Sequence, residues 1–151
     1  MIIRRAILLL LVALPVAAAS STGTVNQQDG PAVGGYDVVA YFTDARAVPG
    51  RGDLTAEHDG AIYRFSSQAN RSAFIESPTR YLPQFGGYCA FGLARGYKAV
   101  IDPQAFTIVD GKLYLNYSQT IQSKWRGQQA TDISLANTNW PKVINSPDVT
   151  K

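Results

Sequence analysis

The sequence predicts a small α+β domain, with two antiparallel β-hairpins and helices packed against the sheet. Two Asp-Gly pairs, at residues 59–60 and 110–111, each separate stretches in which apolar side chains alternate with others. Such a pair between alternating stretches is the strongest short-range signal of a hairpin. The last third of the chain instead carries apolar residues at spacings typical of helices, Trp125 and Trp140 among them.

The first hairpin is expected over residues 54–65, with His58 opposite Ala61 beside the turn, Ala56 opposite Tyr63 and Leu54 opposite Phe65. The period of two places all six side chains on the apolar face. The second is expected over residues 106–117. Because the residues that flank the two turns differ, the hairpins are not interpreted as an internal repeat.

Helix signals precede and follow the first hairpin. Asp37 is placed to cap a short helix that reaches residue 42. Ser66 and Ser67 precede a helix expected over residues 68–77, which Pro78 ends.

Two further helices are expected after the second hairpin. Ser118 is placed to cap the first of them. Thr131 or Asp132 opens the second, and Pro141 is expected to stop it.

Residues 1–19 have the pattern of a secretory signal peptide, because Arg4 and Arg5 precede an apolar stretch and then small residues. Cleavage is expected near Ala19 and Ser20. The apolar stretch is shorter than the roughly 20 residues that a spanning helix needs. We therefore expect a periplasmic or secreted protein without stable membrane insertion after cleavage.

The rest of the chain is divided into a flexible lead-in at residues 20–31, one domain at residues 32–145 and a tail at residues 146–151. The formal net charge of +3 includes two charges of the signal peptide, and no cluster of Lys and Arg remains without it. The composition therefore predicts no nucleic-acid partner.

The segment around Cys89, the only cysteine, concentrates the chemistry of the chain. Gly86 and Gly87 precede it, and Arg95 and Lys98 follow. An odd cysteine in an exported protein indicates a reactive thiol, a metal ligand or pairing between chains. Cations close to an exposed thiol would lower its pKa, so Cys89 is a candidate nucleophile or ligand. The alternative is a buried, inert thiol.

The chain resembles the YHS domain family, and more closely its exported bacterial branch, the YHS domain-containing (seleno)proteins. The residues that carry the resemblance are GYDVVAYF (35–42), DGAIYRFSSQANRSAF (59–74), SPTRYLPQFGGYCAFG (77–92), GYK (96–98), DPQAFTIVDGKLYLNYS (102–118), Lys124-Trp125 and ANTNWP (136–141). They run in one order through nearly all of the chain that follows the signal.

The resemblance implies a small domain associated with metal, since YHS modules occur beside copper-transporting ATPases and other metal-handling proteins. The cysteines of the metal-binding form correspond here to Ala40, Ser66 and Asn70, so those three thiols are missing. Some members of the exported branch carry selenocysteine at the position of Cys89, which implies redox or nucleophilic chemistry there.

The first functional hypothesis is metal association or handling, with copper or another transition metal bound by Cys89 and His58, the only histidine. One chain offers few soft ligands, so a homodimer that supplies two thiols and two imidazoles is one arrangement. Asp37, Glu57 or Asp59 could complete the site within one chain. A metal-handling partner protein is implied.

Two alternatives remain open. Cys89 could be a low-pKa redox thiol that depends on an external thiol or a partner protein, since no second cysteine is present to resolve it. The chain could also be a binding module without chemistry. Its possible pocket gathers side chains near the glycine-rich turns, namely Tyr36, Asp37, Tyr41, Tyr88, Phe91 and Tyr97. Whether the protein is an enzyme is left open.

Overall fold

The structure is a computed structural model that describes residues 23–27 and 30–151. The signal peptide expected at residues 1–19 lies outside the described residues. Within them the expected α+β class is confirmed.

The strands form three two-stranded sheets, which are β1 (Arg51–His58) with β2 (Ala61–Phe65), β4 (Asp102–Val109) with β5 (Lys112–Asn116), and β3 (Lys98–Ala99) with β6 (Val149–Thr150). The helical segments are η1 (Ala32–Gly35), α1 (Ala40–Thr43), α2 (Gln68–Glu76), α3 (Pro78–Tyr81), η2 (Gln84–Gly87), α4 (Ala90–Ala94), α5 (Gln119–Arg126) and α6 (Gln129–Val143), where η denotes a 3₁₀ helix.

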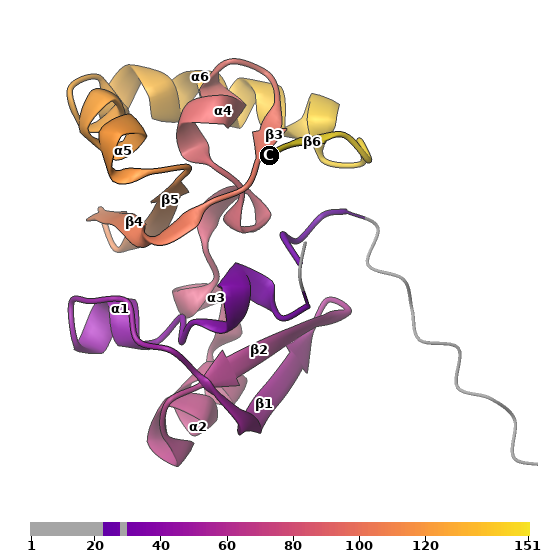
Figure 1. Cartoon of the computed structure of the whole chain (residues 1–151), viewed down its shortest axis with the longest axis vertical. Coiled ribbons are helices and arrows are strands. Elements are labelled where there is room, and N and C mark those ends of the chain that lie inside the picture. The colour runs from indigo at the N-terminus through magenta and orange to yellow at the C-terminus, as the bar shows by residue number, and fades with distance from the viewer. Residues whose placement is uncertain (1–22, 28–29) are drawn as a thin grey trace, which may run out of the picture.

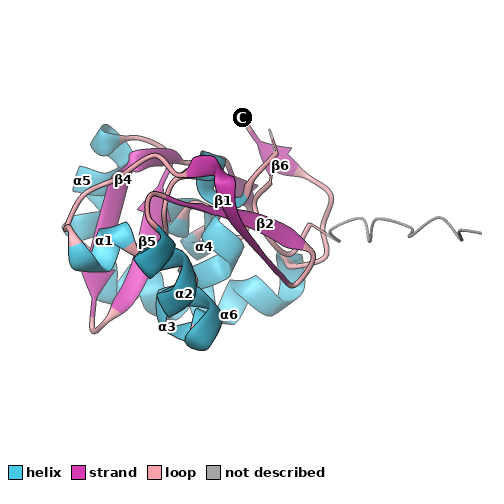
Figure 2. Ribbon diagram, turned by 90° about the horizontal axis from the view of Figure 1, so that it is seen from below, coloured by secondary structure: helices cyan, strands magenta, loops and turns pink. Residues whose placement is uncertain are grey.

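The chain folds as two halves that follow one another in sequence (Figure 1). The first half contains the β1–β2 hairpin with α1 and α2, in the lower part of Figure 1, and the second contains the β4–β5 hairpin with α4, α5 and α6 above it. Figure 2 shows α2 beside the first hairpin and α5 beside β4. The small parallel sheet of β3 and β6 lies next to α4 and the C-terminal end of the chain.

The two halves begin with the same unusual backbone. Val33 and Phe85 have φ/ψ of 54°/35° and 56°/38°, and the glycines that follow them, Gly34 and Gly86, have 60°/20° and 61°/16°. Left-handed values are costly for valine and phenylalanine, so their recurrence is not a chance feature of one loop. In both halves the next tyrosine returns its N–H to the carbonyl three residues before it, at 3.1 Å.

The match continues through the hairpins. Both turn on Asp-Gly with left-handed angles, and in both a bulge separates the first strand pair from the rest of the ladder. The helix that follows is capped in both halves by a serine, Ser67 or Ser118, whose side chain accepts the N–H three residues on at 3.1 Å. The hairpins therefore belong to an internal structural repeat, and the interpretation that they are unrelated is wrong.

The core explains why the two halves stay together. Leu113 and Leu115 of β5 pack into the core of the first half, while Tyr114 between them packs with Trp125 in the core of the second. Successive side chains of a strand point to opposite faces, so one strand serves both cores. Neither half can therefore bury its apolar face alone.

The two terminal segments differ from expectation. Part of the expected lead-in is fixed, because Asn26 is buried and donates its backbone N–H to Gly86 and its side-chain amide to Gly87. The buried Lys98 side chain also donates to the carbonyl of Gly23 at 3.0 Å. The expected tail contributes β6, which pairs with β3. Main-chain hydrogen bonds to distant residues fix both segments, and a local sequence pattern does not reveal such bonds.

Candidate functional site

The first half contains a closed cradle around the carboxylate of Asp37, which is fully buried. Oδ1 accepts the backbone N–H groups of Val39 and Ala40 at 2.9 and 3.3 Å. Oδ2 accepts the N–H and the hydroxyl of Ser66 at 2.8 and 2.7 Å, and the amide of Asn70 at 2.8 Å. Five donors converge on one buried anion, which is how a protein makes such burial tolerable. Two of those donors also provide the helix cap expected of Asp37.

Cys89 occupies the matching position in the second half. It follows the Gly-Gly-Tyr turn as Asp37 does, and it precedes α4 as Asp37 precedes α1. The N–H of Tyr117, just past β5, donates to its Sγ at 3.2 Å, as Ser66 just past β2 donates to Asp37. The N–H groups of Phe91 and Gly92 lie close enough to the sulfur to lower the thiol pKa. The same kind of backbone cradle therefore surrounds a thiol in this half.

Burial nevertheless raises the pKa of the Cys89 thiol above its ordinary value. The three N–H groups and the cationic Arg95 act in the opposite direction without overcoming it. The expectation that nearby cations would leave a low-pKa thiol is therefore wrong in sign, because desolvation of the thiolate outweighs them. Arg95 is in part engaged elsewhere, with Asp132 at 3.2 Å. At neutral pH the resting thiol is protonated.

Asn116, the last residue of β5, is a candidate site residue that the sequence analysis missed. It is fully buried, its Oδ1 lies 3.7 Å from Sγ of Cys89, and the N–H of Phe91 donates to the same oxygen at 3.3 Å. Its Nδ2 is also buried and has no hydrogen-bond partner among the described residues. In the first half the corresponding residue is Phe65, a core residue. A polar residue with an unused donor therefore stands beside the thiol where packing alone would favour a hydrocarbon.

Cys89 also lines a pocket of about 220 Å³. Only 1% of the residue is exposed, so access to the sulfur is through this pocket and not from open surface. Phe91 and Tyr97, two of the expected pocket residues, line it with Cys89. The remaining lining residues are Ala99, Tyr117, Ile121, Thr150 and Lys151.

The other expected pocket residues lie elsewhere. Tyr41 is buried in the core of the first half, packs with its ring tilted against that of Phe106, and donates its hydroxyl to the carbonyl of Pro103. Tyr36 packs against the same core. Tyr88 donates its hydroxyl to the carbonyl of Gly23, and Asp37 is closed off as described. The aromatic side chains near the two glycine turns are divided between the halves.

His58 lies at the end of β1 in the first half. Its ring packs edge-on against Phe74, and its Nε2 is 3.3 Å from the carboxylate of Asp59. Its pairing with Ala61 is as expected. Cys89 has none of these neighbours and precedes α4 in the other half. Within residues 23–27 and 30–151 no three side chains of His, Cys, Asp or Glu stand together as a metal site. A metal role for Cys89 and His58 stays a prediction, which the geometry within one chain does not support.

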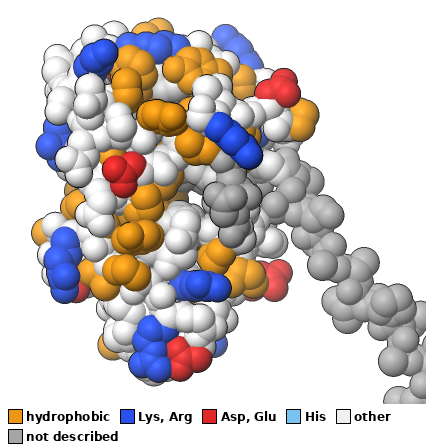
Figure 3. All heavy atoms as spheres, in the orientation of Figure 1, with side chains coloured by type: hydrophobic (Ala, Val, Ile, Leu, Met, Phe, Trp, Pro, Cys, Tyr) orange, Lys and Arg blue, Asp and Glu red, His pale blue; other side chains and the backbone are white. Residues whose placement is uncertain are grey.

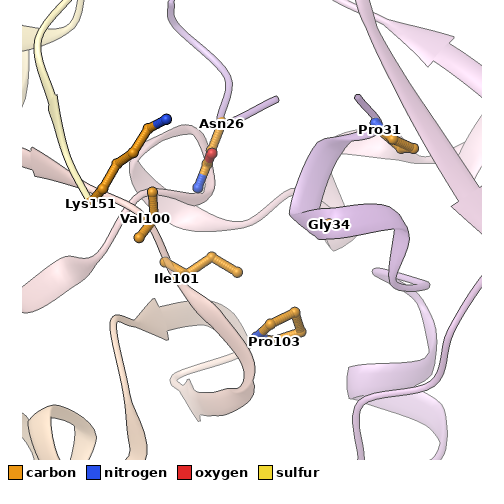
Figure 4. A pocket seen from close by; sticks show the side chains of 7 residues that line it. All are labelled: Asn26, Pro31, Gly34, Val100, Ile101, Pro103 and Lys151. Carbon is orange, nitrogen blue, oxygen red and sulfur yellow. The ribbon is translucent and has the colours of Figure 1, made fainter. Parts of the chain in front are cut away.

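A second pocket, of about 320 Å³, lies between the halves and carries less chemistry (Figure 4). Figure 4 shows Gly34 of η1 and Pro31 on one side, and Val100, Ile101 and Pro103 on the other. The polar side chains among its described lining residues are Asn26 and Lys151. Asn26 already donates to Gly87, Lys151 is exposed, and the described lining residues include no thiol or hydroxyl side chain.

The surface adds no stronger candidate on the face that Figure 3 shows. Lys and Arg are spread over that face, and hydrophobic side chains gather on the upper half and between the halves. No helix of the described residues is both long and apolar enough to cross a membrane. Comparisons with models of protein families, with curated proteins and with solved structures give no match to the chain.

Proposed function

We propose that this protein is a single-thiol redox protein that acts through Cys89, and that its resemblance to the exported YHS branch reflects this use of the thiol position. The observation that carries the proposal is the placement of Sγ. It lies on the wall of a pocket and faces the backbone N–H groups of Phe91, Gly92 and Tyr117.

The raised pKa of Cys89 and the cradle are compatible with reactivity. Burial keeps the resting thiol protonated, while fixed N–H groups stabilise negative charge on sulfur once it develops. Fixed donors act most strongly in a site from which water is excluded, because they need no reorganisation during the reaction. A thiolate formed at a higher pKa is also intrinsically the stronger nucleophile.

The reaction that fits a lone thiol is exchange with a disulfide that enters the pocket. The Cys89 thiol loses its proton to solvent, and Sγ attacks one sulfur of the disulfide. The new bond joins Cys89 to that sulfur, and the other sulfur leaves as a thiolate. Because the chain has no second cysteine, an external thiol must release the protein by the same exchange.

The test uses a small aromatic disulfide whose released thiolate absorbs light. Wild type should release one equivalent per chain, at a rate proportional to the disulfide concentration, and Cys89→Ser should release none. Ile121→Trp, which fills the pocket, should slow the reaction at least about tenfold, equal to about 1.4 kcal/mol of activation free energy. Leu135→Trp is the matched control, because Leu135 is exposed on α6 and does not line the pocket.

A rate that does not depend on the disulfide concentration would show that Cys89 reacts only after the protein unfolds. That result would overturn the proposal, as would equal rates for wild type and Ile121→Trp.

A further inference from the structure

The two cradles share their backbone N–H donors and differ in the length of the side chain that they hold. In Asp37 the acceptor oxygens lie one bond beyond Cγ, and they take all five donors. In Cys89 the side chain stops at Sγ, the atom that corresponds to Cγ. The thiol therefore ends one atom short of where the carboxylate of Asp37 ends, and the pocket that Cys89 lines provides space beyond the sulfur.

Asn116 supplies a second and independent indication of a missing group. Its amide lies against Sγ and keeps a buried Nδ2 that has no partner in the described part of the chain. A buried donor left unused lowers the stability of the fold. The side-chain donors that close the cradle of Asp37, from Ser66 and Asn70, are replaced here by Tyr117 and Ile121. A half-turn of the Asn116 amide would direct its unused donor at an acceptor attached to the sulfur. The same half-turn would release the N–H of Phe91 from Oδ1, so an oxygen on the sulfur would have to accept that N–H as well.

We propose that Cys89 is a site of stable oxidation to the sulfinate by hydroperoxides, and that the sulfinate occupies its cradle as the carboxylate of Asp37 occupies the matching one. A sulfinate carries two oxygens and one negative charge on the sulfur, as a carboxylate carries them on its carbon. This proposal rests on the thiol reactivity proposed above, and it adds a substrate class and a lasting product.

Two equivalents of hydroperoxide are consumed. In the first step the thiolate attacks the distal oxygen, the O–O bond breaks, and the leaving alkoxide or hydroxide takes a proton to give an alcohol or water. Sulfur is oxidised by two electrons to the sulfenic acid, and the peroxide is reduced. The second step repeats this exchange, and the sulfinic acid then releases its proton.

The cradle is tested first without any oxidation, by placing a carboxylate at residue 89. Cys89→Asp is compared with Cys89→Asn, which has nearly the same shape and no charge. If the cradle is built for an anion, the folding equilibrium constant of Cys89→Asp, measured by urea unfolding, should be roughly 5–30 times that of Cys89→Asn. A buried carboxylate without such donors would give the opposite order, and that order would overturn the proposal.

The product is tested on the intact protein with hydrogen peroxide and mass spectrometry. Wild type should gain two oxygen atoms at Cys89 and keep its urea midpoint within the error of the measurement or raise it. Asn116→Phe carries the residue found at the matching position of the first half, so it should fold. Once oxidised in the same way, it should show a lower urea midpoint than before oxidation. Oxidised wild type that unfolds at a clearly lower urea concentration would overturn the proposal.

The two proposals fail in different ways. If Cys89→Asp is less stable than Cys89→Asn while the disulfide reaction proceeds in proportion to reagent, the sulfinate proposal fails and the thiol function stands. If wild type reacts with the disulfide only on unfolding, the thiol function fails whatever the stability of Cys89→Asp.

Discussion

Replacing Asp37 by asparagine tests whether the cradle of the first half holds a charge. The variant removes the charge and places an NH₂ group at one of the two oxygen positions. The position with fewer donors is Oδ1, where the N–H groups of Val39 and Ala40 would then meet another donor. The contacts of Oδ2 with Ser66 and Asn70 would remain as weaker, uncharged hydrogen bonds.

The size of the effect follows from these bonds. A hydrogen bond to a charged group contributes about 1.5–3 kcal/mol, so the two bonds lost at Oδ1 give about 3–6 kcal/mol. Breaking a buried charged network by changing one partner typically costs about 3–5 kcal/mol. We therefore expect Asp37→Asn to lower the free energy of unfolding by about 3–5 kcal/mol, a large part of the stability of a domain of this size.

Urea unfolding followed by tryptophan fluorescence measures this loss, since Trp125 is fully buried in the second core. Asp53→Asn is the matched control: it is the same substitution in an exposed ion pair with Arg51. Its effect should be close to the error of the measurement. If Asp37→Asn costs no more than Asp53→Asn, the cradle does not hold a charge, and the reasoning applied to Cys89 loses its basis.

Three other predictions concern the second half and the metal hypothesis. The rate of alkylation of Cys89 should give an apparent pKa above the ordinary value of about 8.5, because burial raises the pKa of the thiol, and an apparent pKa below 8.5 would contradict this. Since the folded state favours the protonated thiol, wild type should lose stability relative to Cys89→Ser as pH rises above about 8.5. Gly34→Ala should lower the free energy of unfolding by about 1–2 kcal/mol for the left-handed backbone alone. Gly86→Ala should lower it by about 3 kcal/mol or more, because the added Cβ would lie 1.9 Å from the carbonyl oxygen of Thr24. Equal urea midpoints of the two variants would show that residues 23–27 do not pack there. A copper site shared by Cys89 and His58 would lose affinity in Cys89→Ala and His58→Ala alike during copper titration, and equal affinities in all three proteins would exclude it.

Local signals were sufficient to predict the hairpins and the two helix starts that Ser67 and Ser118 cap. The last helix begins at Gln129 and not at Thr131 or Asp132 as expected. The Asp-Gly turns placed both hairpins, and the pairings of His58 with Ala61 and Ala56 with Tyr63 are confirmed. The bulge in β1 was missed, so Phe65 pairs with Arg51 and not with Leu54 as expected. A bulge is set by the path of the chain beyond the hairpin, which alternation does not reveal.

Prolines were less reliable signals. Pro78 ends the preceding helix as expected and opens α3. Pro141, expected to stop the last helix, lies inside α6, which runs from Gln129 to Val143. The last turn of a helix depends little on a single N–H group, so tertiary packing can carry the chain past a proline there.

The repeat was missed because the positions that differ are the ones that carry the chemistry. Asp37 and Cys89 differ in charge, and Phe65 and Asn116 differ in size and polarity, so the two segments look unrelated at these positions. The positions that match are those that the backbone requires, such as Ser67 and Ser118 at the helix starts. The recurrence of Pro-x-x-Gly-Gly-Tyr at residues 31–36 and 83–88 was the signal that could have revealed the repeat.

The division of roles between the halves follows from what closes each cradle. In the first half, the side chains of Ser66 and Asn70 complete the donor set, so the site is satisfied and serves the fold. In the second half, the matching Tyr117 and Ile121 line a pocket, and Asn116 beside the sulfur has an amide donor that no described residue accepts. A structure that needed only stability could have repeated the aspartate. The thiol, the pocket and the unused donor occur together in one half, and a site that accepts a reactive small molecule accounts for all three.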